Sequence, residues 1–177
     1  ASYRSAGSAV DLLNDEDQRL QTIKADITDP EGLEGIAANI RANGDQPDFV
    51  VNAAGILHEQ QLQPEKSLRQ CQHDSLMRMF QVNSIGPLML AREVVPLMPK
   101  NRPAHFAVLS AMVGSIGDNR LGGWYGYRAS KAALNQLMRT LSVELRRSHP
   151  QLCVTAIHPG TTDTSLSRPF QANVKPG

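Results

Sequence analysis

The stretch Trp124-Tyr125-Gly126-Tyr127-Arg128-Ala129-Ser130-Lys131 determines how the rest of the chain is interpreted. Strong helix formers follow it, so Tyr127 and Lys131, four residues apart, are predicted to lie side by side on one helix face. An ammonium beside a phenol stabilises the phenolate and lowers the phenol's pKa from its usual value of about 10. Such a pair suits proton exchange near neutral pH. The alternative is an ordinary amphipathic helix that carries a surface Tyr and Lys.

The composition predicts one soluble globular domain. A chain of 177 residues can bury a sizeable core, and 41% apolar and 20% charged residues are ordinary for a globular protein. A formal charge of +1 gives no electrostatic reason to expect nucleic acid or an anionic membrane as a partner. No apolar run approaches the roughly 20 residues of a membrane span, and no signal-peptide pattern opens the chain. We therefore expect a single domain over residues 1–177, with neither nucleic acid nor membrane as a partner.

The cysteines and histidines favour a reduced protein without a metal. Cys71 and Cys153 lie far apart and in no motif, which is typical of unpaired thiols in a cytoplasmic protein. The five histidines are scattered, and no cluster has metal-ligand spacing. The chain opens without an initiator Met and stops in a loop-like tail, so we interpret it as a fragment or as part of something longer.

Strand and helix patterns alternate along the chain. Apolar strands are predicted at residues 20–25, 49–51, 104–109 and 152–157. Helices are predicted at residues 30–42, 73–97 and from Tyr127 to about Ser148. The first of them has a capping Asp29, Pro30 in its first turn, and Asn43-Gly44 at its end.

This alternation predicts an α/β fold with a doubly wound parallel sheet. In such sheets, ligands bind beyond the carboxyl ends of the strands. Four groups of candidate residues follow predicted strands and should meet at this edge: Asp26, Asn52–Gly55, Ser110 and Pro159–Gly160.

Several motifs together resemble the short-chain dehydrogenase/reductase family. They occur in the family's order and span nearly the whole chain: Asp26, Asn52-Ala53-Ala54-Gly55, Val82-Asn83, Ser110, Tyr127-x-x-x-Lys131 and Pro159-Gly160. Residues 114–119 and 122–128 resemble the C-factor-like and sniffer-like branch, which holds NADPH-using carbonyl reductases and relatives linked to cell signalling. The resemblance implies a Rossmann-like, three-layer fold.

The resemblance implies a role for each residue of the central motifs. Tyr127 would give its proton to a carbonyl oxygen as hydride arrives from a nicotinamide. Lys131 would lower the Tyr127 pKa and bind the nicotinamide ribose. Asn83 would distort the long helix and hold a water that links Lys131 to solvent. For Asn83, the alternative is a polar residue that caps a kink without any chemical role.

Further positions are implied as contacts of the same cofactor. Asp26 and Ile27 would lie at the adenine, although Asp26 could equally be a turn residue. The small residues Asn52, Ala53, Ala54 and Gly55 would let the backbone approach the cofactor, or simply form a tight turn. Pro159-Gly160, with Thr162 or Thr164, would hold the nicotinamide carboxamide; here too the alternative is only a turn after a strand.

Arg4 bears on the choice between NADP and NAD. The resemblance puts it near the ribose 2′ position, where a guanidinium suits a 2′-phosphate and an acidic residue would favour NAD. We therefore expect NADP in preference to NAD. The alternative is a solvated surface arginine.

The chain also departs from the family pattern. The glycine-rich phosphate-binding turn, with its strand and helix, does not precede Tyr3, and the last strand is missing after Gly177, so the fold is expected to be incomplete at both ends. Where the family usually has two serines, this chain has Ser110-Ala111. Ser110 is the first candidate to orient the substrate carbonyl, and Ser115 is the alternative.

Two functions follow from these features. The first is an oxidoreductase that transfers a hydride between NADP(H) and a carbonyl or secondary alcohol, with Tyr127 as proton donor and acceptor. The alternative is a weakly catalytic or non-catalytic nucleotide-binding signalling protein of the same fold. Fold alone does not choose between them. The long helix and the Tyr127 helix have apolar outer positions of the kind that this family uses to form dimers and tetramers. We therefore expect a homodimer or homotetramer. The sequence does not identify the substrate.

Overall fold

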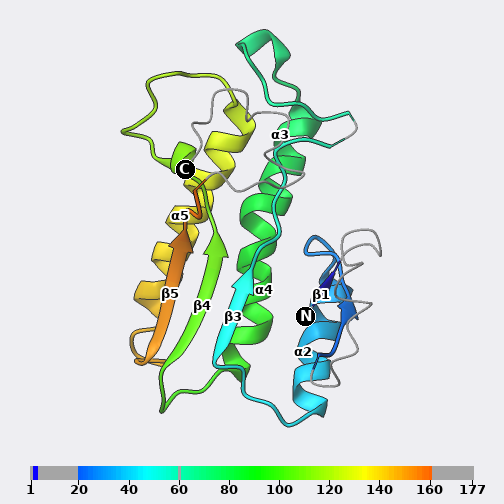
Figure 1. Cartoon of the computed structure of the whole chain (residues 1–177), viewed down its shortest axis with the longest axis vertical. Coiled ribbons are helices and arrows are strands. Elements are labelled where there is room, and N and C mark those ends of the chain that lie inside the picture. Colours follow the sequence, from blue (N-terminus) through cyan, green and yellow to red (C-terminus); the bar gives the residue numbers. More distant parts are fainter. Residues whose placement is uncertain (1, 4–19, 60, 161–177) are drawn as a thin grey trace.

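The computed structural model describes residues 2–3, 20–59 and 61–160 (Figure 1). Its strands form two parallel groups. β1 (Ser2–Tyr3) pairs with β2 (Ile23–Lys24). β3 (Phe49–Asn52), β4 (Ala104–Leu109) and β5 (Leu152–Ile157) form a three-stranded sheet in that order. Within the described ranges no ladder joins β2 to β3.

The sheet confirms the strands predicted at residues 49–51, 104–109 and 152–157. Asn52 lies opposite Val108, and Leu109 lies opposite Ile157, so the carboxyl ends of the three strands share one edge (Figure 1). The strand predicted at residues 20–25 is shorter than expected, because only Ile23 and Lys24 pair with β1.

The first described helix begins and ends as its local signals predict. α2 (Pro30–Ala42) starts at Asp29, whose side chain accepts a hydrogen bond from the Glu31 backbone N–H at 3.1 Å. After Ala42 the chain turns through Gly44, which has a φ of +69° that few residues other than glycine adopt readily.

The long helix predicted at residues 73–97 is present, but its backbone changes type three times. It consists of α3 (His73–Phe80), the π-helical turn η3 (Gln81–Ile85), α4 (Gly86–Val94) and the 3₁₀ turn η4 (Val95–Leu97). Gly86 lies directly after the π turn, where an added Cβ would lie 2.9 Å from Ile27 Cγ1. A side chain at position 86 would therefore force the segment after β2 to shift.

The helix that carries Tyr127 is α5 (Tyr125–Glu144). It ends earlier than the expected Ser148, and residues 145–148 form a turn before Pro150. Within this turn the His149 N–H still donates to the Leu145 carbonyl at 2.8 Å. Two short 3₁₀ turns, η2 (Leu68–Gln70) and η5 (Met112–Gly114), lie in the connections.

Two apolar clusters hold these elements together. In the larger one, side chains of β4 pack against α4 and α5, with Phe106 and Val108 fully buried beside Val94, Leu134 and Met138. The smaller cluster contains Ile56, Leu57, Leu62, Met79, Val82 and Tyr127. Tyr127 is therefore part of a packed core and not a surface side chain.

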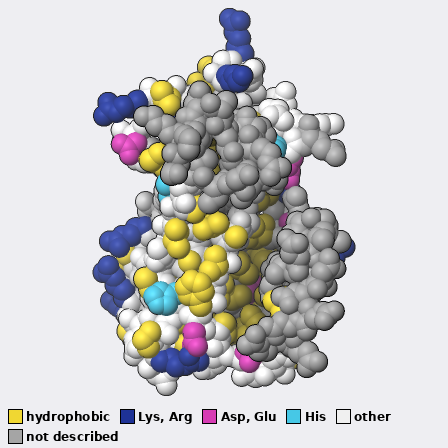
Figure 2. All heavy atoms as spheres, in the orientation of Figure 1, with side chains coloured by type: hydrophobic (Ala, Val, Ile, Leu, Met, Phe, Trp, Pro, Cys, Tyr) yellow, Lys and Arg dark blue, Asp and Glu magenta, His cyan; other side chains and the backbone are white. Residues whose placement is uncertain are grey.

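The face of the sheet that points away from α4 and α5 is exposed in the described part of the chain. Phe49 and Val51 of β3 are 63% and 46% exposed, and Ile157 of β5 is 38% exposed. Apolar side chains accordingly gather over the three strands in Figure 2. Among the described helices, none is both long and apolar enough to span a bilayer.

We predict that Phe106→Ala lowers the free energy of unfolding by about 3–5 kcal/mol, because it removes a fully buried ring from the larger cluster. Phe49→Ala is the matched control, with an expected loss of about 0.5 kcal/mol at an exposed position of the neighbouring strand. Urea denaturation monitored by circular dichroism measures the free energy of unfolding of both variants. Equal losses for the two variants would contradict this account of the core.

Candidate active site

Tyr127 and Lys131 lie together in the first two turns of α5. They are 7% and 3% exposed, and the Lys131 Nζ lies 5.8 Å from the centroid of the Tyr127 ring. The side-by-side arrangement predicted from their spacing is confirmed, and the alternative of a surface pair is wrong.

The Lys131 ammonium is held at the carboxyl edge of the sheet. Its Nζ donates a hydrogen bond of 2.7 Å to the carbonyl oxygen of Leu109, the last residue of β4. Burial disfavours the charged form and lowers the pKa of Lys131 from 10.5 to about 8. A part of the Lys131 population can therefore lose its proton under mildly alkaline conditions.

Burial affects Tyr127 in the other direction. It raises the pKa of the phenol above its usual value, because the phenolate is also a charged form that loses hydration. This direction is opposite to the one expected from the neighbouring ammonium, since desolvation outweighs the attraction of Lys131. Tyr127 is thus protonated at neutral pH, as a proton donor must be.

Asn83 lies in the π turn and is fully buried. Its side-chain oxygen accepts from the Ile56 N–H at 2.8 Å, and its amide nitrogen donates to the Ile56 carbonyl at 2.8 Å and to Ser130 Oγ at 3.1 Å. Ser130 in turn donates to the carbonyl oxygen of Tyr127 at 2.9 Å. The expected helix distortion at Asn83 is confirmed, whereas its role in proton transfer stays a prediction.

Sequence reasoning missed Ser130 as part of this network. The only local signal is a small polar residue next to Lys131 on the same helix. Its partner Asn83 is 47 residues away, which no helical spacing reveals.

The Asn52–Gly55 segment forms a tight turn beside Lys131. Asn52 is 5% exposed, and its side-chain oxygen accepts from the Ala54 N–H at 3.1 Å. A Cβ added at Gly55 would lie 3.4 Å from both Asn83 Oδ1 and Lys131 Nζ. The absence of a side chain at Gly55 therefore leaves room next to the two polar groups on which the site prediction depends.

The two candidate serines have different surroundings. Ser110 follows β4, and its hydroxyl donates to Asn135 Oδ1 at 2.7 Å. Ser115 follows η5 and lines a hollow with Tyr125, Arg128 and other residues of a face of α5 that does not include Tyr127 or Lys131. Which serine would serve a substrate stays a prediction.

The remaining cofactor candidates lie partly outside the described residues. One carboxylate oxygen of Asp26 accepts from the N–H and hydroxyl of Thr28, at 2.8 and 2.7 Å, as in the turn alternative. Ile27 packs against Gly86, and Pro159-Gly160 directly follows β5. Arg4, Thr162 and Thr164 lie outside the described residues.

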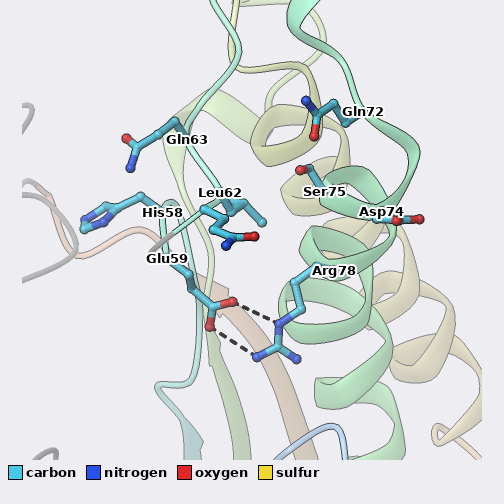
Figure 3. Close-up of a pocket in the computed structure, with 9 residues that line it drawn as sticks. His58, Glu59, Leu62, Gln63, Gln72, Asp74, Ser75 and Arg78 are labelled. Atoms are coloured by element: carbon cyan, nitrogen blue, oxygen red, sulfur yellow. Dashed lines mark hydrogen bonds and ion pairs between the residues drawn. The ribbon is translucent and has the colours of Figure 1, made fainter.

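A separate polar hollow lies between α3 and the segment after β3. Figure 3 shows Glu59 and Arg78 pointing toward one another across it, and their side chains form two hydrogen bonds of 3.1 and 3.2 Å. The other lining residues are His58, Gln61, Leu62, Gln63, Gln72, Asp74 and Ser75. Neither Tyr127 nor Lys131 lines this hollow, so it is distinct from the candidate site.

Comparison with known proteins identifies the family. The profile described as short chain dehydrogenase matches residues 2–175, which is nearly the whole chain. The chain belongs to the short-chain dehydrogenase/reductase family, as the sequence motifs predicted.

Curated relatives place the chain within that family. The 1-hydroxy-2-glutathionyl-2-methyl-3-butene dehydrogenase of Rhodococcus sp. (strain AD45) is 34% identical over 145 residues, or 82% of this chain and 60% of that protein. The C-signal protein of Myxococcus xanthus is 36% identical over 95 residues, or 53% of this chain and 55% of that protein. The chain thus spans less than two thirds of the length of either relative.

Solved structures share the fold. The carbonyl reductase Sniffer of D. melanogaster has a TM-score of 0.80 and 26% identity, over 93% of this chain and 69% of that one. The NADPH-bound carbonyl reductase from chicken fatty liver also has a TM-score of 0.80 and 26% identity, over 94% of this chain and 69% of that one. These likenesses confirm the predicted Rossmann-like α/β class and, with C-signal, the predicted C-factor-like and sniffer-like branch.

We predict that Lys131 makes stability rise with pH. Between about pH 7.5 and pH 9.5 the unfolded chain keeps the Lys131 proton while the folded chain loses it, so the free energy of unfolding should rise by roughly 2 kcal/mol from this residue. Lys131→Met should lack that rise. Urea denaturation of both proteins at the two pH values measures the difference. Parallel pH dependences would show that Lys131 titrates normally in the folded chain.

Proposed function

We propose that the full-length protein is an oxidoreductase that transfers a hydride between NADP(H) and a carbonyl compound or secondary alcohol. The observation that carries the proposal is the buried pair of Tyr127 and Lys131 at the carboxyl edge of a parallel sheet, joined to Asn83 through Ser130. Membership of the short-chain dehydrogenase/reductase family supports the reaction class.

The residues present fit a nicotinamide dinucleotide. Gly55 leaves space beside Asn83 Oδ1 and Lys131 Nζ that a Cβ would fill, and donors, acceptors and a buried cation border that space. Lys131, the Asn52–Gly55 turn, the Asp26-Ile27 segment and Pro159-Gly160 would hold the dinucleotide. When bound, it would supply or accept the hydride.

In the reductive direction, Tyr127 would donate its hydroxyl proton to the carbonyl oxygen as the carbonyl carbon gains the hydride. The carbonyl would become an alcohol, and a proton from solvent would restore the phenol. Lys131 would stabilise the transient phenolate, because an adjacent ammonium favours it. Asn83 would fix the Ile56 segment and, through Ser130, the Tyr127 backbone.

NADP is proposed in preference to NAD. The support is the NADPH-bound carbonyl reductase among the similar structures and the arginine at position 4 of the sequence. Met77 of α3 and Val143 of α5 are about half exposed, which is consistent with further burial between copies in a homodimer or homotetramer.

A signalling role is the second candidate. The Ser110 hydroxyl already donates to Asn135, the following residue is Ala111, and C-signal is a relative. In that case the function would depend on nucleotide binding and not on turnover.

We predict that Tyr127→Phe lowers the turnover of NADPH with a panel of aldehydes, ketones and quinones by at least about 100-fold, because it removes the proton donor. NADPH affinity should stay within about twofold, since the ring and its packing remain. Tyr125→Phe is the matched control: its exposed phenol, two residues earlier on α5, should be dispensable. Retained turnover in Tyr127→Phe would reject the enzymatic proposal.

We also predict that the full-length protein binds NADPH more tightly than NADH, and that Arg4→Ala weakens NADPH roughly tenfold while leaving NADH unchanged, since a charge-assisted contact to the 2′-phosphate is lost. Titration followed by nicotinamide fluorescence measures both affinities. Equal affinities for the two nucleotides would reject the preference. If neither nucleotide bound, both candidate functions would be rejected.

A further inference from the structure

Glu65 is a buried carboxylate that sequence motifs do not single out. It lies in the connection between β3 and α3, is 3% exposed, and is 61 residues from its side-chain partner on α5. A carboxylate is rarely buried this deeply without a partner. Its partners therefore indicate what it does.

Glu65 satisfies two N–H groups at the start of α5. Its carbonyl oxygen accepts from the Trp124 N–H at 2.5 Å, and its side-chain Oε2 accepts from the Gly126 N–H at 3.1 Å. Trp124 occupies the capping position but makes no capping hydrogen bond with its own side chain. Because the first N–H groups of a helix lack partners within the helix, and its N-terminus favours negative charge, Glu65 caps α5 from a distant segment.

The backbone that enters α5 is strained. Gly122, Gly123 and Trp124 are consecutive left-handed residues with φ values of +65°, +64° and +52°. A left-handed conformation at a bulky residue is strained and persists only where the surroundings hold it. The hydrogen bond from Trp124 to the Glu65 carbonyl is such a restraint.

The space around the carboxylate is filled. A Cβ added at Gly126 would lie 3.0 Å from Glu65 Oε1 and 3.1 and 3.2 Å from Leu76 and Met79 of α3. The carboxylate and α3 therefore both lie close against the first turn of α5.

This turn determines where Tyr127 lies. Tyr127 directly follows Gly126, and its ring meets the Trp124 ring edge-on, with 6.1 Å between the centroids and 74° between the planes. Holding Trp124 and Gly126 thus fixes both the backbone of Tyr127 and one neighbour of its ring.

We propose that Glu65 is a positioning residue for Tyr127: it holds the strained entry to α5 through the Trp124 and Gly126 N–H groups and so fixes the phenol for proton transfer. The catalytic part of this inference rests on the proposed function. The structural part does not, which allows the two to be tested apart.

Three substitutions change the side-chain contact with Gly126 and keep the backbone hydrogen bond to Trp124, and they separate the hydrogen bond from the charge. Glu65→Gln keeps an acceptor oxygen at the same reach, Glu65→Asp keeps the charge but is one methylene too short, and Glu65→Ala removes both. Glu59→Ala is the matched control, because Glu59 is a carboxylate of the same connection whose side chain pairs with Arg78 of α3. Thermal unfolding of each variant identifies those that fold.

The structural readout is Trp124, the only tryptophan of the sequence, so its emission and its quenching by acrylamide report this turn directly. Glu65→Asp and Glu65→Ala should shift the emission and increase quenching, while Glu65→Gln and Glu59→Ala should match the parent. Emission that is unchanged in both the Asp and Ala variants would overturn the proposal, whether or not the protein is an enzyme. If Glu65→Ala fails to fold, the Asp and Gln variants decide.

The catalytic readout is kcat with NADPH and a carbonyl compound of the same panel that the parent reduces, per site that binds NADPH. Glu65→Asp and Glu65→Ala should lose roughly 10- to 100-fold in kcat, because a small displacement of a reacting group costs about that much, with the KM for NADPH within about twofold. Glu65→Gln should restore kcat. A kcat that is unchanged in Glu65→Asp would overturn the positioning role. No turnover in the parent with any member of the panel, with the expected Trp124 shifts, would instead reject the proposed function and keep the structural part.

Discussion

The arrangement of the candidate site depends on satisfying one fully buried amide. Asn83 has no access to solvent, so each of its polar atoms needs a partner within the protein. It finds them on two sides, in the Ile56 backbone and in Ser130 of α5. These hydrogen bonds join the turn after β3, the π turn and the helix of Tyr127 into one unit. Loss of any partner would leave a buried group unsatisfied and loosen all three.

Burial also determines the electrostatics of the site. Removing Tyr127 and Lys131 from water favours the neutral form of both, which raises one pKa and lowers the other. Lys131 therefore loses its proton more easily than Tyr127 does. The sequence had suggested the opposite arrangement, an acidic phenol beside a lysine that stays charged. In the proposed mechanism, proton transfer at Tyr127 would depend on how much of the Lys131 population is charged, and hence on the polarity of whatever fills the space beside Gly55.

Local signals predicted the elements well and the site only in part. Asp29, Pro30 and Gly44 fixed the bounds of α2, because caps act within a few residues. The four-residue spacing placed Tyr127 and Lys131 on one face, and the ordered motifs led to the right family. The direction of the Tyr127 pKa could not be predicted, since it depends on how far tertiary packing buries the ring. Ser130 and Glu65 were also missed, because their partners are 47 and 61 residues away.

The exposed face of the sheet has a consequence for handling the molecule. Phe49 and Val51 lie on β3, whose outer edge has no paired strand among the described residues, so open backbone groups and apolar side chains occur on the same strand. An unpaired strand edge with apolar side chains is a template for a strand from another copy. The 177-residue polypeptide on its own is thus expected to precipitate by strand-to-strand association as its concentration rises. Lysines introduced at positions 49 and 51 should oppose this without touching Tyr127 or Lys131.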